Sequence, residues 1–202
     1  MRPLRSSGLL TKVSRLHARD TPSPASPATD ALCPATPLSA RQDHPDLIQL
    51  FESLSAAEDP RTATLIERRI WDLWVASDRD DVDRLMRRGR SAMGFRDYDA
   101  AIETFDRIVE LDPEFAEGWN KRATVHFLRR DFAASLTDIA RTLALEPRHF
   151  GALEGRGMIY EEQGELEKAL ADYERVLTIR PHVRGLRRRI EQLRREIGQR
   201  AT

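Results

Sequence analysis

The chain has 202 residues, 33 basic and 33 acidic, so its formal net charge is zero. It is 40% hydrophobic and lacks the run of roughly 18 apolar residues that a membrane-spanning helix needs, which excludes that class. Cys33 is the single cysteine, which excludes a disulfide-stabilised scaffold, and a neutral total gives no indication of nucleic-acid binding.

The neutral total hides three segments of different charge. Residues 1–45 carry six basic and three acidic residues, a net +3. Residues 182–202 carry seven arginines and two glutamates, a net +5. The intervening residues 46–181 therefore hold 20 basic and 28 acidic residues, a net −8. Such a blocky distribution indicates segments with different roles.

Residues 1–45 are predicted to form a disordered leader. They contain seven of the 11 prolines and few large apolar residues, so folding them would not offset the lost backbone entropy. The first 19 residues hold five basic residues, three serines and no acid, a composition similar to that of an organellar presequence. We expect a cytoplasmic protein, with mitochondrial or other organellar import as the alternative; a solvated extension explains the same composition.

Residues 46–81 are predicted to form two helices, the second starting near Pro60. Ile70, Trp71 and Trp74 recur at helical spacing in this second helix, and we expect the two tryptophans to serve packing.

A repeat of 34 residues follows. Pro113, Pro147 and Pro181 are 34 residues apart, and each follows a similar apolar phrase. Small residues recur in register at two places per repeat: Gly89, Ala123, Gly157 and Ala101, Ser135, Ala169. Large residues recur beside them: Leu85, Trp119, Leu153 and Phe105, Ile139, Tyr173. A proline ends a helix because it lacks the N–H, and small residues let two helices approach closely.

This pattern resembles the tetratricopeptide repeat (TPR) family, and is similar to small alphaproteobacterial TPR proteins. The resemblance implies an all-α helix-turn-helix solenoid with repeats at 82–115, 116–149 and 150–182. Residues 46–81 then form a degenerate helical pair that caps the N-terminal end of the stack. The apolar stripe at Leu186, Ile190, Leu193 and Ile197 predicts a C-terminal capping helix over 183–198. In the turns, Asp97 and Asp131 are expected helix N-caps.

The sequence shows no constellation for catalysis, so we expect no enzyme, no cofactor and no metal site. The five histidines are scattered without metal-ligand spacing, and His126 stands at an aromatic place inside a repeat. Glu161 and Glu162 are adjacent, but a solvated helix end explains them better than acid–base chemistry.

The resemblance instead directs attention to the inner surface lined by the first helix of each repeat, where the family binds peptides or helices. By register, the candidate groove residues are Met86, Arg87, Arg90, Met93, Asn120, Lys121, Thr124, Phe127, Leu128, Glu154, Met158, Glu161 and Glu162. Their order is basic, then apolar, then acidic. This order suggests a partner with acid at one end, apolar anchors centrally and base at the other. Ordinary solvated charges on helix faces are the alternative.

Some TPR co-chaperones bind a C-terminal carboxylate through a clamp of Lys, Asn, Asn, Lys and Arg. The corresponding places here hold Met86, Arg90, Lys121, Gly151 and Gly155, so we expect no such clamp. The arginines of the C-terminal helix could contact phosphate or anionic lipid, but a solvated cap explains them, and we expect no specific nucleic acid. The predicted function is a protein-interaction adaptor or scaffold; the alternative is an organelle-imported assembly or structural factor associated with a membrane complex.

Overall fold

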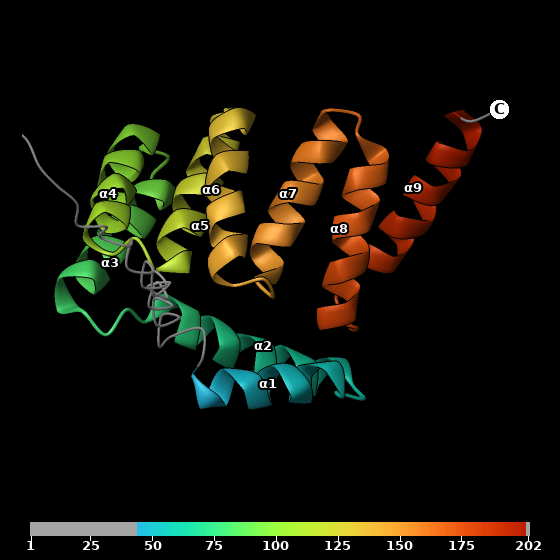
Figure 1. Cartoon of the computed structure of the whole chain (residues 1–202), viewed down its shortest axis with the longest axis horizontal. Helices are drawn as coiled ribbons and strands as arrows, with labels where there is room; N and C mark the ends of the chain where they lie inside the picture. Colours follow the sequence, from blue (N-terminus) through green and yellow to red (C-terminus); the bar gives the residue numbers. More distant parts are fainter. Residues whose placement is uncertain (1–43, 201–202) are drawn as a thin grey trace, which may run out of the picture. The chain divides into compact units, whose positions relative to one another are not determined.

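A computed structural model describes residues 44–200, which form nine α-helices (Figure 1). Residues 1–43 of the expected disordered leader, including its targeting segment, lie outside the described residues, and Pro45 is already the first residue of a helix. The helices are α1 (Pro45–Ser55), α2 (Pro60–Val75), α3 (Asp80–Gly94), α4 (Tyr98–Leu111), α5 (Ala116–Leu128), α6 (Phe132–Leu145), α7 (Phe150–Glu162), α8 (Leu166–Ile179) and α9 (Leu186–Arg200).

The repeat region consists of three helix pairs, α3 with α4, α5 with α6, and α7 with α8, each packed on the next along the chain. The all-α repeat architecture predicted from the sequence is confirmed. Helix α9 packs on α8, where its buried Ile190 and Leu193 join a cluster with Leu166, Ala169 and Tyr173. The apolar stripe of this helix thus covers the C-terminal face of the last pair.

Glycine allows the close approach of helices within a pair. A Cβ placed on Gly89 would lie 2.7 Å from the Phe105 ring, and one placed on Gly157 would lie 2.5 Å from the Tyr173 ring. Both distances are far below ordinary carbon contacts, so these positions accept no larger residue without movement of a buried ring. The recurrent small places therefore mark where the two helices of a pair cross.

Each turn within a pair contains one residue in the left-handed region. These residues are Arg96 (φ 62°), Arg130 (φ 62°) and Gly164 (φ 74°), spaced 34 apart. The next residue starts the second helix: the Asp97 side chain accepts a hydrogen bond from Ala100 N, and Asp131 caps α6 in the same way. The two N-caps predicted from the sequence are confirmed.

The second and third repeats each contain a partly buried ion pair between their two helices. Arg122 donates two hydrogen bonds, of 2.8 and 2.7 Å, to Asp138. At the equivalent places 34 residues later, Arg156 donates two hydrogen bonds of 2.7 Å to Asp172. The first repeat has Thr104 at the aspartate place, and its hydroxyl donates to Ala100 O instead. Such forked pairs fix the rotation of one helix against the other.

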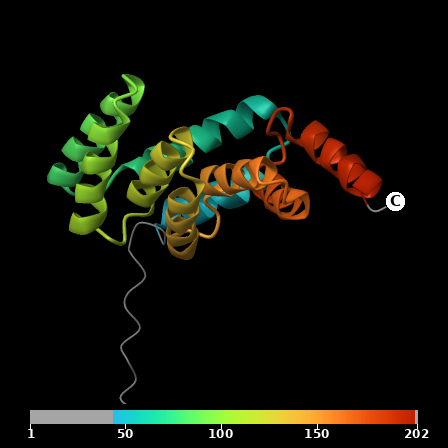
Figure 2. The same ribbon diagram turned by 90° about the horizontal axis from the view of Figure 1, so that it is seen from above.

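Helices α1 and α2 are placed differently from the expectation that they cap the N-terminal end of the stack. They lie across the ends of α5, α7 and α8 (Figures 1 and 2). The reason is their apolar surface: Leu47, Leu54 and Ile70 are fully buried in one cluster with Phe150 and Leu153 of α7 and Val176 of α8. Burial of each such side chain contributes about 1.5–3 kcal/mol, so this seam is part of the core.

Polar contacts hold the same seam together. Glu67 of α2 accepts a 2.7 Å hydrogen bond from Arg180, which also donates one of 2.5 Å to Glu154. His182 Nε2 lies 2.7 Å from the carbonyl oxygen of Ala57, to which it donates. The helical pair is therefore tied to the last repeat by residues more than a hundred positions away in sequence.

We expect Arg96→Gly to raise the free energy of unfolding by about 0.5–1 kcal/mol, because glycine adopts positive φ without the clash of a Cβ. Arg96 is exposed, so little packing is lost. The reverse change, Gly164→Ala, should lower the free energy of unfolding. Urea titrations followed by circular dichroism measure both, and an unchanged midpoint for Arg96→Gly would contradict the argument.

Candidate functional site

A hollow of about 300 Å³ opens between α5, α6 and α7. Its lining residues are Asn120, Ala123, Thr124, Phe127, Leu128, Ser135, Ile139, Gly151, Ala152, Glu154, Gly155 and Met158. Most of these side chains are apolar or small, and polar atoms are confined to a few positions. This is the composition of a surface that anchors an apolar side chain and orients it with few hydrogen bonds.

The hollow exists because α7 presents two glycines to it one turn apart. A Cβ on Gly155 would meet only Ile139, at an ordinary contact distance of 3.8 Å. At Gly151 a Cβ would lie 2.9 Å from the Trp71 ring of α2, so this glycine is already covered. Of the two glycines that line the hollow, Gly151 is therefore covered by α2, and Gly155 has room for a small side chain.

The accessible part has an apolar rim. Leu128 at the end of α5 is 45% exposed, and Met158 of α7 is 47% exposed. Phe127 is half-buried and packs on Phe132 with ring centroids 5.8 Å apart. Large apolar side chains exposed beside a hollow are typical of binding surfaces.

A second hollow, of about 320 Å³, lies beside α2 and is lined by Trp71, Asp72, Val75, Arg90 and Lys121. The ammonium of Lys121 lies 5.3 Å from the centroid of the Trp71 ring and 2.8 Å from Glu117 Oε1. Arg90 is exposed. Two of the three cations predicted for the groove, Arg90 and Lys121, thus line one hollow together with the Trp71 ring.

Beneath the two hollows lies a fully buried pair, Glu117 and His149. Glu117 Oε2 lies 3.1 Å from His149 Nε2 and accepts a 2.7 Å hydrogen bond from Asn120. Because His149 Nδ1 accepts from Ala152 N as the N-cap of α7, its proton resides on Nε2 and is donated to Glu117. The His149 ring stacks on Trp74 with centroids 4.2 Å apart.

This cluster sets the charge of Glu117. Burial favours the protonated carboxyl, but the hydrogen bond from His149 and the charge of Lys121 outweigh it and lower the pKa of Glu117 below its ordinary value. The carboxylate is therefore kept ionised at neutral pH. It joins α5, α7 and, through the stacked Trp74, α2.

The structure distributes eight of the thirteen predicted groove residues between the two hollows. Six line the first hollow and two line the second: Asn120, Thr124, Phe127, Leu128, Glu154, Met158, and Arg90, Lys121. Arg87 is exposed but lines neither hollow. Met86 was wrongly placed in the groove: it is 1% exposed and packs in the core with Val82 and Phe105. Met93 is half-buried against the same cluster.

The predicted acidic end is neutralised by arginines. Glu154 accepts from Arg180 at 2.5 Å, and Glu162 from Arg130 at 3.0 Å. Glu161 is bonded to Arg189 of the capping helix. Sequence reasoning missed these pairings because two of the three arginines lie outside the repeat that carries the acids.

Sequence reasoning also missed Trp71, Asp72 and Val75 of α2 as parts of the site. The helical spacing of Trp71 and Trp74 indicated packing, which is correct, but not which surface they pack against. The one signal in the sequence is the pair of a glycine at position 151 and a large aromatic residue at position 71, which can pack closely on a glycine.

Within residues 44–200, no helix is both long and apolar enough to cross a membrane. The same residues contain no group of three or more His, Cys, Asp or Glu side chains that could hold a metal ion.

The stacked helix pairs and their open hollow define an α-helical repeat protein. The tetratricopeptide repeat family model matches residues 86–142 and 123–183. Residues 86–183 therefore carry tetratricopeptide repeats.

Two known proteins are similar to this chain in sequence. A TPR repeat-containing protein of Rhizobium etli is 36% identical over 118 residues, 58% of this chain and 58% of that protein. Protein bimA of Emericella nidulans is 29% identical over 99 residues, 46% of this chain and 12% of bimA. The chain thus spans little more than half of the first relative and a small part of the second.

Two solved structures are similar in fold. The crystal structure of MamA superposes with a TM-score of 0.55 and 26% identity, covering 59% of this chain and 70% of MamA. The first TPR of Spaghetti (RPAP3), bound to the HSP90 peptide SRMEEVD, has a TM-score of 0.56 and 24% identity, and the match covers 58% of this chain and 94% of that one.

We expect Glu117→Gln to lower the free energy of unfolding at neutral pH by about 1–3 kcal/mol, because His149 and Lys121 lose a buried ionised partner. The folded carboxylate takes up its proton at lower pH than the unfolded one. The unfolded state therefore gains protons first as pH falls, and wild-type stability declines through that range.

The stability difference between wild type and Glu117→Gln should accordingly shrink below about pH 5. Urea unfolding at a series of pH values measures it, with Glu103→Gln, an exposed carboxylate of α4, as the matched control. A difference that stays constant down to acid pH would contradict the assigned role of the Glu117 charge.

Proposed function

We propose that this protein is a non-enzymatic interaction adaptor that binds a peptide or helix of a protein partner in the hollow between α5 and α7. One observation carries the proposal: Leu128 and Met158 are nearly half exposed on either side of a hollow that Gly155 leaves open. An apolar side chain of a partner would bury both.

The comparisons support this use of the surface. The repeat family matches the helices that build the hollow, and a structure of the same fold is bound to a peptide. The bound peptide belongs to that protein alone. Because the fold is shared, we expect a peptide to bind the corresponding surface of this chain. We assign no catalytic step to it.

The charges near the hollow suggest the direction of the bound segment. Arg87 and Arg90 are exposed on α3, whereas the three glutamates at the other side are ion-paired. We therefore propose a partner with apolar anchors and an acidic residue on its α3 side, and no requirement for a basic residue at its other end. Such charges act mainly on orientation and association rate.

The anchor prediction can be tested with peptides selected from a displayed random library on the full-length protein. We expect the selected peptides to carry large apolar residues, and the double change Leu128→Asp with Met158→Asp to weaken their binding at least about tenfold, because central apolar contacts dominate interface energy. Isothermal titration calorimetry measures the affinity.

Phe95→Asp is the matched control, because Phe95 is 84% exposed in the turn after α3 and lines neither hollow. Its variant should bind like wild type. Equal loss with Phe95→Asp, or binders indifferent to the double change, would place the binding surface elsewhere.

The charge prediction concerns the same selected peptides. We expect Arg90→Glu to weaken binding by about threefold to tenfold at low ionic strength, with the difference reduced in high salt, because exposed charges are screened. Arg88→Glu makes the same charge change on an exposed position of α3 that lines neither hollow. An effect of Arg88→Glu equal to that of Arg90→Glu would indicate a diffuse field rather than a contact.

A further inference from the structure

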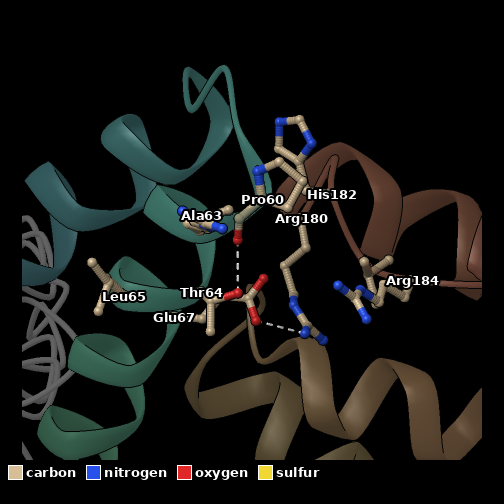
Figure 3. A pocket seen from close by; sticks show the side chains of 10 residues that line it. Pro60, Ala63, Thr64, Leu65, Glu67, Arg180, His182 and Arg184 are labelled. Carbon is tan, nitrogen blue, oxygen red and sulfur yellow. Dashed lines mark hydrogen bonds and ion pairs between the residues drawn. The ribbon is translucent and has the colours of Figure 1, made fainter.

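A cleft separate from the proposed groove lies against α2. It has a volume of about 470 Å³ and is formed by the start of α2 and the segment that joins α8 to α9 (Figure 3). The residues that matter for its chemistry are Arg61, Leu65, Glu67, Arg180, Val183 and Arg184.

Two guanidinium groups in this cleft have no acidic partner among residues 44–200. Arg61 and Arg184 are both exposed, and neither forms an ion pair there. The nearby Asp59 is engaged in capping: its carboxylate accepts hydrogen bonds from the Thr62 hydroxyl and from the backbone N of Thr62 and Arg61, and these bonds lower its pKa. The first turn of α2 contains no acidic residue.

The one carboxylate that lines the cleft is already committed. Glu67 accepts a 2.7 Å hydrogen bond from Arg180, whose long side chain runs along the cleft to reach it (Figure 3). Arg180 also donates a hydrogen bond to Glu154. Burial raises the pKa of Glu154, and the negative charge of Glu67 adds to this effect. Arg184 lies on the same side of the cleft as the Arg180 guanidinium (Figure 3).

The cleft also offers apolar contacts beside these charges. Leu65 of α2 is 64% exposed, and Val183 is half-buried on the opposite side. A ligand that places a negative group between Arg61 and Arg184 can therefore bury an apolar group against the same walls.

We infer that this cleft binds an acidic protein segment, with a carboxylate between Arg61 and Arg184 and a neighbouring apolar side chain on Leu65 and Val183. The planar guanidinium suits a carboxylate or a phosphate equally. The carboxylate is favoured because Glu67 and Glu154 lie close behind Arg180, and they repel a doubly charged phosphate more strongly than a singly charged group.

Such an occupant would also stabilise the seam it spans. The cleft has α2 on one side and the segment after α8 on the other, so a ligand bound there holds α1 and α2 on the last repeat. A ligand that binds only the folded state raises its stability in proportion to the logarithm of ligand concentration.

The test uses the full-length protein and a blocked hexapeptide that alternates leucine with glutamate, titrated at low salt and followed by amide NMR shifts. We expect saturable shifts at Arg61, Thr64, Val183 and Arg184 and a rise in Tm. The matching peptide with glutamine in place of glutamate should bind about tenfold more weakly, because it lacks the charge that the arginines recognise.

The variant Arg61→Glu with Arg184→Glu should lose the binding, and Arg188→Glu with Arg195→Glu, two exposed positions of α9, should retain it. All four side chains are exposed, so the variants should fold, and circular dichroism checks this. Absent shifts at the cleft, equal binding of the glutamine peptide, or unchanged binding by the cleft variant would overturn the proposal. Shifts with inorganic phosphate but not with the peptide would overturn it in favour of a phosphate site.

Discussion

The arrangement of this protein depends on the missing side chains of Gly151 and Gly155 at the start of α7. The first lets the ring of Trp71 lie directly on the helix backbone, and so fixes where α2 docks. The second leaves the hollow between α5 and α7 unfilled. A larger side chain at Gly151 would displace the Trp71 ring, whereas one at Gly155 would extend into the hollow and reduce its volume. The absence of a side chain at Gly151 thus determines where α2 covers α7, and its absence at Gly155 determines where the surface of α7 stays open.

The hollow is held by a stiff frame. Arg122 with Asp138 and Arg156 with Asp172 tie the two helices of the second and third repeats together, and these helices carry every side chain that lines the hollow. Below it, Glu117 and His149 connect α5 to α7. Hydrogen bonds between buried side chains favour one packing among many. The apolar rim therefore stands on helices with fixed rotation, which reduces the ordering cost of binding.

The local sequence determined the repeats because their period, small places and N-caps depend on neighbours a few residues away. Asp97 and Asp131 were predictable for that reason, as were the positions of Phe127, Leu128 and Met158 by register. The docking of α2 was not predictable, because it depends on Trp71 meeting Gly151, 80 positions later. Met86 was misplaced because the register of a repeat assigns a residue to a helix face but does not say how deeply its side chain is buried. The free charge of the acidic end was overestimated because its partners Arg180 and Arg189 lie outside the first helices of the repeats.

The contacts between Glu67 and Arg180, and between Ala57 and His182, have a consequence for modularity. An ordinary repeat array can gain or lose a unit, since each unit touches only its neighbours. Here the N-terminal pair binds the last repeat as well as α5, so the span between them is fixed. Insertion of another repeat would move α8 out of its reach and expose a buried seam. The number of repeats in this protein is therefore constrained by its own structure, and evolutionary change is directed to side chains rather than to array length.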